Sequence, residues 1–261
     1  MLNKNLILDV GMHNGQDTDF YLKKGFDVVA IEANKDLCTE VREKYPNELI
    51  NGRLTVLNVA ISDKSGMLSF FINKKNTKWS SIYSKLGKKG GQGANKVDVF
   101  GSSMLNVIKL FGVPYYMKID IEGADKLAIR QVANLEIKPP FLSVEGGGPD
   151  MISMLEAQGY DRFAIVNQRK NPDLKCCNPP LEGDYVDYQF QMGASGMFGN
   201  EITQEWLDAE TAKIERQKFA DLIQEMRIEA NGDQTKLMKM RWQSGIGWYD
   251  THACFSEYLK D

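Results

Sequence analysis

Short apolar runs alternate with amphipathic stretches along the first two thirds of the chain. The apolar runs, several of them rich in β-branched residues, lie at residues 5–10, 26–32, 54–61, 115–121, 141–145 and 162–167. The amphipathic stretches include residues 16–24, 35–44, 125–135 and 150–158. Strands and helices that alternate in this way form a parallel sheet with helices on both faces. The pattern therefore predicts a doubly wound, mostly parallel α/β fold.

Three regions depart from this alternation. Residues 58–73 hold the turn sequence Asp63-Lys64-Ser65-Gly66 between two apolar runs, which indicates a hairpin. Residues 84–96 hold four glycines and four lysines without an acidic residue, so we expect a mobile loop. Residues 201–230 carry apolar side chains near helical spacing and end at Asn231-Gly232, which predicts one long helix. We expect one domain over residues 1–192, followed by a helical arm and aromatic tail over residues 193–261 that serves packing or oligomerisation.

Composition narrows the class of protein. The 32 Lys and Arg residues against 35 Asp and Glu give a net charge of −3, without the basic excess of nucleic-acid-binding proteins. The four cysteines show no C-x-x-C spacing, which favours a reducing compartment over a disulfide scaffold. No apolar run approaches the ~20 residues of a membrane span, and the N-terminus does not resemble a signal peptide. We therefore expect a cytoplasmic globular protein with no nucleic-acid partner and no membrane span.

The first apolar run leads into a glycine-bearing turn, Asp9-Val10-Gly11-Met12-His13-Asn14-Gly15. Such a turn lets a ligand approach the backbone next to the N–H groups of a helix. It differs from the dinucleotide pattern G-x-G-x-x-G, because Asp9 takes the first position and the last glycine comes one residue late. A carboxylate there would repel a pyrophosphate but suits the ammonium and sulfonium of S-adenosylmethionine (SAM). As a purely structural residue, Asp9 would cap a turn at the end of a strand.

A second carboxylate, Glu32, closes the second apolar run. An acidic residue at this point can accept both ribose hydroxyls of a nucleoside, a role shared by NAD and SAM sites. Its alternative role is a solvated residue at a helix N-terminus. Because Asp9 and Glu32 follow successive strands, we favour the cofactor interpretation.

Four segments also stand in the order and spacing of a known family. They are residues 9–15, Ile31-Glu32-Ala33-Asn34, Asn58-Val59-Ala60-Ile61-Ser62 and Lys118-Ile119-Asp120-Ile121-Glu122-Gly123-Ala124-Asp125. They resemble the FkbM-type family of SAM-dependent methyltransferases, whose pattern K-x-D-x-E-G-x-E is met except for Asp125 in place of glutamate. The resemblance covers residues 5 to about 170. It implies a seven-stranded, Rossmann-like methyltransferase fold, SAM as cofactor, and methyl transfer to a hydroxyl oxygen, often on a sugar or a polyketide.

The resemblance also implies a set of cofactor-binding residues. Asn58 and Ala60 would lie near the adenine, and Ser81, or its neighbour Ser80, would bond the methionine carboxylate unless this stretch is a plain polar loop. The full expected set is Asp9, Gly11, Met12, His13, Asn14, Gly15, Glu32, Ala33, Asn34, Asn58, Ala60, Ser81 and Asp120.

A neutral hydroxyl is a poor nucleophile, so methyl transfer to it needs a general base. Asp120, Glu122 and Glu145 are candidates because they stand at carboxyl ends of parallel strands, where ligands bind in this architecture. Asp120 and Glu122 are two apart on one expected strand and would share a face, where they would share a proton or hold a divalent cation. The sequence does not require a metal. Each carboxylate could instead bond only the local backbone.

The two histidines, His13 and His252, are further candidates for the base. His13 lies within the glycine turn, where it is either catalytic or a hydrogen-bonded loop residue. His252, in the C-terminal tail, could fold back over the pocket.

These observations predict a SAM-dependent O-methyltransferase that acts on a sugar, a glycan or a similar polyhydroxylated small molecule. One alternative is an NAD-dependent sugar-modifying oxidoreductase, which Asp9 disfavours. The other is an inactive SAM-binding or scaffolding module, which the carboxylates at the strand ends disfavour. Lysines 85, 88, 89 and 96 are interpreted as a solvated loop, and the helix over residues 201–230 as a route to a homo-oligomer.

Overall fold

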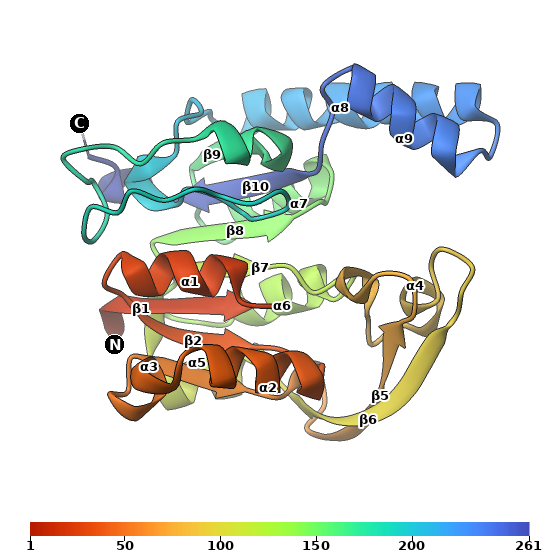
Figure 1. Ribbon diagram of the computed structural model, residues 1–261. Helices are drawn as coiled ribbons and strands as arrows, with labels where there is room; N and C mark the ends of the chain where they lie inside the picture. Colours follow the sequence, from red (N-terminus) through yellow and green to blue (C-terminus); the bar gives the residue numbers. More distant parts are fainter. Residues whose placement is uncertain (261) are drawn as a thin grey trace. The chain divides into compact units, whose positions relative to one another are not determined.

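A computed structural model describes residues 1–260, the side chain of Gln234 excepted, and its main feature is a seven-stranded sheet (Figure 1). The strand order is β3-β2-β1-β7-β8-β10-β9. The pairs β1–β2, β1–β7 and β2–β3 are parallel, whereas β9 and β10 are antiparallel. The predicted mostly parallel α/β sheet is therefore confirmed.

The chain forms two compact units, Met1–Leu142 and a second unit that begins at Ser143. Strand β8 (Phe141–Glu145) spans the point of division. This division differs from the boundary expected at residue 192, and the residue 193–261 extension as a separate module stays a prediction.

The first unit holds the parallel strands that lead to the candidate site. They are β1 (Leu2–Val10), β2 (Asp27–Ile31), β3 (Leu54–Leu57) and β7 (Val113–Ile119). Its larger helices are α1 (Gln16–Lys23), α2 (Lys35–Lys44), α3 (Pro46–Ile50), α5 (Met104–Phe111) and α6 (Asp125–Val132). The second half of β1, residues 6–10, is buried without interruption, as parallel strands covered on both faces are.

A small second sheet in this unit replaces the predicted hairpin. Its strands β4 (Ala60–Ile61), β5 (Gly66–Asn73) and β6 (Ala94–Ser102) have the order β4-β6-β5. The hairpin prediction was wrong because β6 pairs with both β4 and β5. The glycine at position 101 permits this close pairing, since a Cβ there would lie 2.5 Å from a Leu68 methyl carbon and 2.7 Å from Ser62 Oγ.

The loop prediction for residues 84–96 was wrong at both ends. The segment begins with a short helix, α4 (Ser84–Gly87), which follows the 3-10 helix η1 (Thr77–Trp79), and its last residues start β6. The Asn73 side chain holds the segment by donating to the carbonyls of Gly87 and Lys89 at 2.8 and 2.7 Å.

The second unit combines β9 (Arg162–Asn167) and β10 (Tyr249–Cys254) with three helices. The helices are α7 (Pro149–Glu156), α8 (Ala209–Ala230) and α9 (Gln234–Gln243), and the 3-10 helices are η2 (Gln168–Asp173), η3 (Gly199–Glu201) and η4 (Ser256–Tyr258). Residues 249–254 of the C-terminal tail form a fully buried strand, and a role of the tail in packing or oligomerisation stays a prediction.

Helix α8 begins later than the sequence pattern predicts. Asp208 caps it by accepting the backbone N–H of Thr211 at 2.8 Å, and Leu207, just before it, bridges to Phe163 of β9. Its 22 residues therefore span about 33 Å. It packs against α7, α9 and β9, so it belongs to the body of this unit. Within residues 1–260, no helix is long and apolar enough to cross a membrane.

Candidate functional site

The turn between β1 and α1 is held against two neighbouring strand ends. The backbone N–H groups of Gly11 and Met12 donate to the carbonyl of Ile31, at the end of β2, at 2.9 and 3.1 Å. Gly11 has φ +87°, and a Cβ there would lie 1.8 Å from the carbonyl oxygen of Asp120. Only glycine allows this approach, so the turn and the segment after β7 meet at position 11.

A buried charge cluster supports the turn. Asp9 is fully buried and accepts hydrogen bonds from Thr18 Oγ1 at 2.6 Å and Lys118 Nζ at 3.2 Å. Lys118 Nζ also donates to the Gly11 carbonyl at 2.8 Å and lies 3.6 Å from Asp17 and 3.9 Å from Asp120. In this arrangement Asp9 stabilises the turn through Lys118, and its direct contact with a ligand cation stays a prediction.

The charge state of this cluster follows from its carboxylates. Burial alone would lower the pKa of Lys118, but Asp9, Asp120 and Asp17 reverse the effect and hold its pKa well above the usual value. The ammonium therefore stays charged at any physiological pH.

Glu32 connects the end of β2 to the glycine turn. Its Oε2 accepts the backbone N–H of His13 at 3.1 Å, and its Oε1 accepts that of Asn34 at 2.8 Å. Burial raises the pKa of Glu32, and these two N–H groups oppose the increase. Because each carboxylate oxygen has a second lone pair, Glu32 can still accept the two hydroxyls of a ribose.

The expected adenine-side residues lie around this strand end. Asn58 Nδ2 donates to the carbonyls of Glu32 and Ala33, at 3.0 Å each. Ala33 and Ala60 belong to one buried apolar cluster, and Asn34 caps α2 by accepting the N–H of Asp36. The structure thus brings all of these residues together, and their contact with an adenine stays a prediction.

The segment after β7 is a turn, so the prediction that Asp120 and Glu122 share a strand face was wrong. Strand β7 ends at Ile119, and Glu122 has φ +44°. The physical reason is Asp125, whose two oxygens accept the N–H groups of Ile121 and Gly123 at 2.9 Å each. These bonds bend the backbone into the start of α6.

Glu122 is a carboxylate of this turn whose pKa lies near neutrality. Burial raises its pKa to about 7, and Asp120 and Asp125 add to the increase, whereas Lys89 opposes it. The Glu122 carbonyl accepts a hydrogen bond from Ser81 Oγ at 2.7 Å. Ser81 is buried and also accepts the N–H of Tyr83, so its hydroxyl fixes the turn in place.

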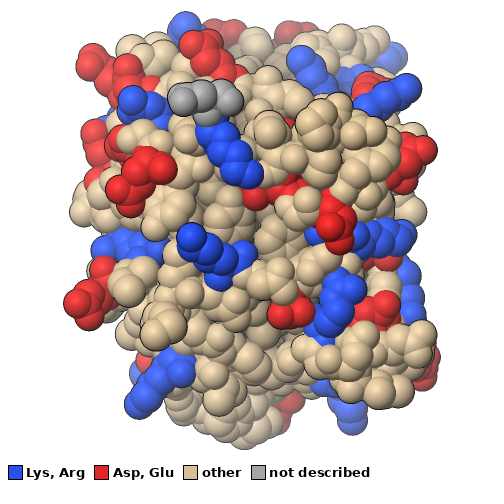
Figure 2. Space-filling view, turned by 90° about the vertical axis from the view of Figure 1, so that its left-hand side faces the viewer, with Lys and Arg blue, Asp and Glu red and all other residues tan. Residues whose placement is uncertain are grey.

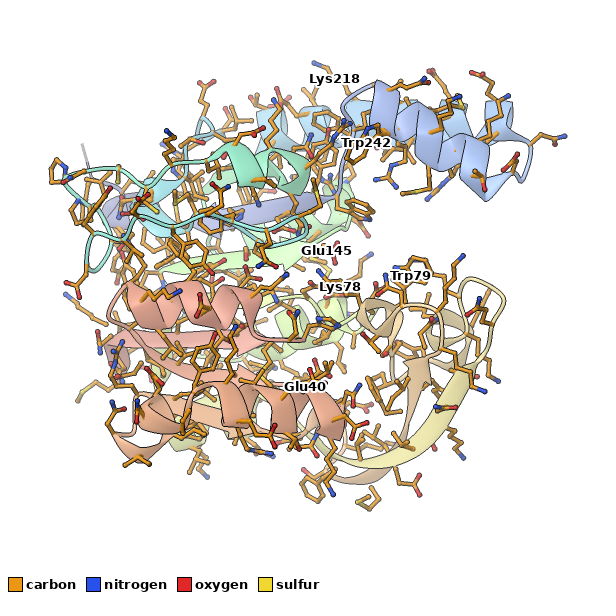
Figure 3. The ribbon with its side chains drawn as sticks, viewed as in Figure 1. Glu40, Lys78, Trp79, Glu145, Lys218 and Trp242 are labelled. Carbon is orange, nitrogen blue, oxygen red and sulfur yellow. The ribbon has the colours of Figure 1, made fainter. Side chains whose placement is uncertain are left out.

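His13 lies where the glycine turn meets helix η1. Its Nε2 lies 2.9 Å from the hydroxyl oxygen of Thr77, and Lys78 and Trp79 project from the same short helix (Figure 3). Burial, and then the charge of Lys78, lower the pKa of His13, so the ring is neutral near pH 7. A neutral imidazole at the rim of the turn is a second possible proton acceptor.

The remaining candidates lie in the second unit. Glu145 is the last residue of β8 and is partly buried. His252 lies within β10, where burial lowers its pKa to about 3. The His252 side chain is 1% exposed, and the idea that it could fold back over a pocket stays a prediction.

Sequence reasoning missed the role of Lys118 and of Asp17 beside it, and it missed Thr18, whose hydroxyl donates to Asp9. The signal was present as a lysine inside the apolar run Tyr115-Tyr116-Met117-Lys118-Ile119. A lysine is almost never fully buried unless it is paired, so its position called for a carboxylate nearby.

A metal site needs clustered ligands, and a nucleic-acid site needs clustered basic side chains. Among residues 1–260, no group of three or more His, Cys, Asp or Glu side chains is arranged to hold a metal ion. On the face of the described chain that Figure 2 shows, acidic and basic side chains are interspersed without a continuous basic patch.

The residues of the first unit fit a nucleoside that carries a cationic sulfur. Helix α1 starts without a side-chain cap, behind a turn whose Gly15 has φ +77°. Glu32 offers acceptor capacity for a ribose, and the carboxyl side chain of Asp120 is 31% exposed. SAM matches each of these features in chemistry.

Comparison with known proteins gives a match to one family. A model of the methyltransferase FkbM domain matches residues 9–162. No curated protein matches the chain. Similar solved structures include precorrin-6y C5,15-methyltransferase from Geobacter metallireducens GS-15, with 11% identity, coverage of 98% of this chain and 82% of that one, and a TM-score of 0.40. The methyltransferase domain of the bacterial protein CtHen1-CN has 12% identity, coverage of 62% and 80%, and a TM-score of 0.36. These structural similarities are weak, so the informative result is the sequence match.

Proposed function

The chain belongs to the FkbM family of SAM-dependent methyltransferases, and we propose that it methylates a hydroxyl oxygen of a sugar, a glycan or a similar polyhydroxylated small molecule. The observation that carries the proposal is Glu122, a half-buried carboxylate in the turn after β7 whose pKa of about 7 suits it to accept a proton at neutral pH. SAM would supply the activated methyl carbon.

In this proposal the glycine turn and the end of β2 hold the cofactor. Residues 11–15 approach it with their backbone, and Glu32 accepts hydrogen bonds from the ribose hydroxyls. Asn58 and Ala60 border the adenine, and Ser81 lies toward the methionine end. Asp120 places negative charge near the sulfonium.

Glu122 is the proposed general base. An alcohol must lose its proton as it attacks the methyl carbon, and a base works best when its pKa lies near the working pH. Asp120 raises the pKa of Glu122 by its like charge, so the two carboxylates have different tasks. His13 and Glu145 are the other proposed proton acceptors, and a divalent cation is not required.

Cofactor binding is tested first, by the change in melting temperature that S-adenosylhomocysteine (SAH) produces. We expect SAH to raise the melting temperature of the wild type and of Glu40→Gln, an exposed carboxylate on α2 that serves as the matched control (Figure 3). Glu32→Gln should weaken SAH binding about tenfold, because it removes charge-assisted acceptors for the ribose. An unchanged melting curve at saturating SAH would contradict the cofactor assignment, and a shift with NAD instead would favour the oxidoreductase.

The acceptor is tested separately with methyl-labelled SAM. The protein is incubated with a panel of neutral sugars, amino sugars, acidic sugars, glycans and RNA, and the product is analysed by mass spectrometry and NMR for the position of the methyl group. Methylated RNA or a methylated nitrogen would overturn the acceptor class while leaving methyl transfer intact. SAH binding without turnover on any acceptor would favour a binding module.

We also propose that the protein self-associates through the region of residues 201–230. Ile214 and Ile228 of α8 are 51% and 69% exposed, which is unusual for isoleucine on a helix that packs against other elements.

A further inference from the structure

A pocket of about 280 Å³ lies within the second unit. It is lined by the Gly146-Gly147 turn that follows β8, by one face of α8, and by Tyr249 at the start of β10. The α8 residues of the lining are Arg216, Phe219, Ala220, Ile223 and Arg227, whose spacing of three or four residues puts them on the same face. The volume is close to the lower bound of ~300 Å³ for small-molecule sites.

Arg216 is a buried cation in this lining, with 6% of its surface exposed. It donates to the carbonyls of Gly146, at 2.9 Å, and of Gly147. Within residues 1–260, its Nε has no hydrogen-bond partner. Burial lowers the pKa of Arg216, while Asp250 opposes this effect. Burial of a charged group is costly unless the group is well paired, so an anion that enters the pocket and meets the Arg216 guanidinium would be stabilised.

Two more guanidinium groups add positive charge around Tyr249. Arg227 lines the pocket and is exposed. The pKa of Arg241 is lowered mainly by burial and, to a smaller extent, by the like charge of Arg227. Burial raises the pKa of Tyr249, and the charges of Arg216 and Arg241 oppose the increase. Asp250 is an acidic group that acts on Arg216, and it accepts a hydrogen bond from Gln168 at 2.8 Å.

We propose that this pocket binds a small anionic ligand of about one sugar ring, with its phosphate or carboxylate on Arg216 and Arg227. The planar fork of a guanidinium matches both anions in bidentate geometry. The apolar part of the ligand would lie against Phe219 and Ile223. The proposal does not depend on methyl transfer, because none of these residues belongs to the proposed SAM site.

The test is calorimetric titration of the full chain, at low ionic strength, with glucose 6-phosphate, glucuronate, inorganic phosphate and glucose. We expect one or both of the acidic sugars to bind, glucose not to bind, and the affinity to fall as salt is added. If glucose 6-phosphate has the lower Kd, phosphate is the preferred anion. If glucuronate has the lower Kd, carboxylate is preferred. Inorganic phosphate should bind more weakly than the preferred sugar, since it lacks the apolar contacts.

Two variants locate the ligand. Arg227→Gln should weaken binding about tenfold, and it should fold normally because Arg227 is exposed. Lys218→Gln, an exposed charge on the same helix outside the lining (Figure 3), should bind as the wild type does. Equal losses in both variants, or no heat with either acidic sugar, would overturn the proposal.

Discussion

At the scale of single residues, the ion pair of Lys118 and Asp9 shows how a charged cluster can be structural inside a binding site. Lys118 Nζ contacts Asp9 at 3.2 Å and the Gly11 carbonyl at 2.8 Å, so one ammonium fixes both the strand end and the turn. Asp17 and Asp120 lie within 4.0 Å of the same ammonium. Three carboxylates therefore surround the one ammonium group of Lys118.

Replacement of Lys118 should lower the free energy of unfolding. Lys118→Met leaves Asp9 charged and buried without its partner, and we expect a loss of about 3–5 kcal/mol in the free energy of unfolding. The loss is measured by urea denaturation at pH 7. The double variant Lys118→Met with Asp9→Asn should be less destabilised than the single variant, because no uncompensated charge remains. A double variant as unstable as Lys118→Met would mean that packing, not charge, controls this position.

Glu122 should control the pH dependence of turnover. If it is the base, Glu122→Gln lowers kcat by about 10²–10⁴-fold and leaves the Kd of SAH within a small factor of the wild type. For the wild type, kcat/KM should rise with pH and level off above about pH 7, as the carboxylate loses its proton. Near wild-type turnover in Glu122→Gln would transfer the role to His13 or Glu145.

Ionisation of Glu122 should also affect stability. The ionised form that favours turnover should lower the free energy of unfolding. The pKa of Glu122 in the folded protein, about 7, lies above the ordinary value of 4.5, so the folded state binds the proton more tightly. Glu122 therefore destabilises the fold progressively from about pH 4.5 to about pH 7. We expect Glu122→Gln to raise the melting temperature relative to the wild type at pH 8 and to have a smaller effect at pH 4. An equal effect at both pH values would contradict the raised pKa.

At the scale of elements, the close approach of the β1–α1 turn to the segment after β7 can be tested at one glycine. Gly11→Ala would place a Cβ 1.8 Å from the Asp120 carbonyl, so the backbone must move, and both stability and SAH affinity should fall. Gly52→Ala is the matched control: its φ of +79° is similar, but a Cβ there meets nothing within 4 Å. The control should lose only the ~1–2 kcal/mol of left-handed backbone strain. Similar losses in both variants, measured by denaturation and by SAH titration, would contradict the steric argument.

The elements that the sequence predicts well are those with an uninterrupted pattern. Residues 141–145 and 162–167 form strands with the predicted bounds, and α2 spans residues 35–44 as predicted. These segments have clear apolar periods and turn residues at their ends.

The failures have local causes. Strand β6 starts inside a stretch rich in glycine and lysine, so its alternation of exposed and buried residues begins only near Val97. Pairing of β6 with both of its neighbours depends on contacts between distant residues, which no local pattern reveals. Helix α8 starts at Ala209 because Asp208 caps it, although apolar residues occur at helical spacing before that point.

The candidate site was predictable in its composition but less so in its geometry. The family pattern contains Asp120 and Glu122, yet their arrangement depends on the bend that Asp125 imposes through the N–H groups of Ile121 and Gly123. Asp9 was likewise predicted to contact a ligand. Its hydrogen bond with Lys118 joins residues far apart in the sequence, so the local pattern around Asp9 does not reveal it.

At the scale of the whole molecule, the chain divides its chemistry between two compact units. The first holds the residues proposed for SAM and for the base, and the second holds a cationic pocket and the exposed isoleucines of α8. Self-association through α8 predicts a dimer or larger oligomer in light scattering at high protein concentration. Ile228→Glu should shift the population toward the monomer, and Met67→Lys, at an exposed position in the first unit, should not. A wild type that is monomeric at every concentration would rule out this assembly.

The raised pKa of Glu122 also links cofactor charge to proton release. Near pH 7 the carboxylate is partly protonated, and a sulfonium bound nearby favours its ionised form, so SAM binding should expel a fraction of a proton into the buffer. The apparent enthalpy of SAM binding would then vary with the ionisation enthalpy of the buffer. SAH, whose sulfur is neutral, should show much less variation, and Glu122→Gln should show little with either ligand. Binding of SAM would thus release more protons than binding of SAH.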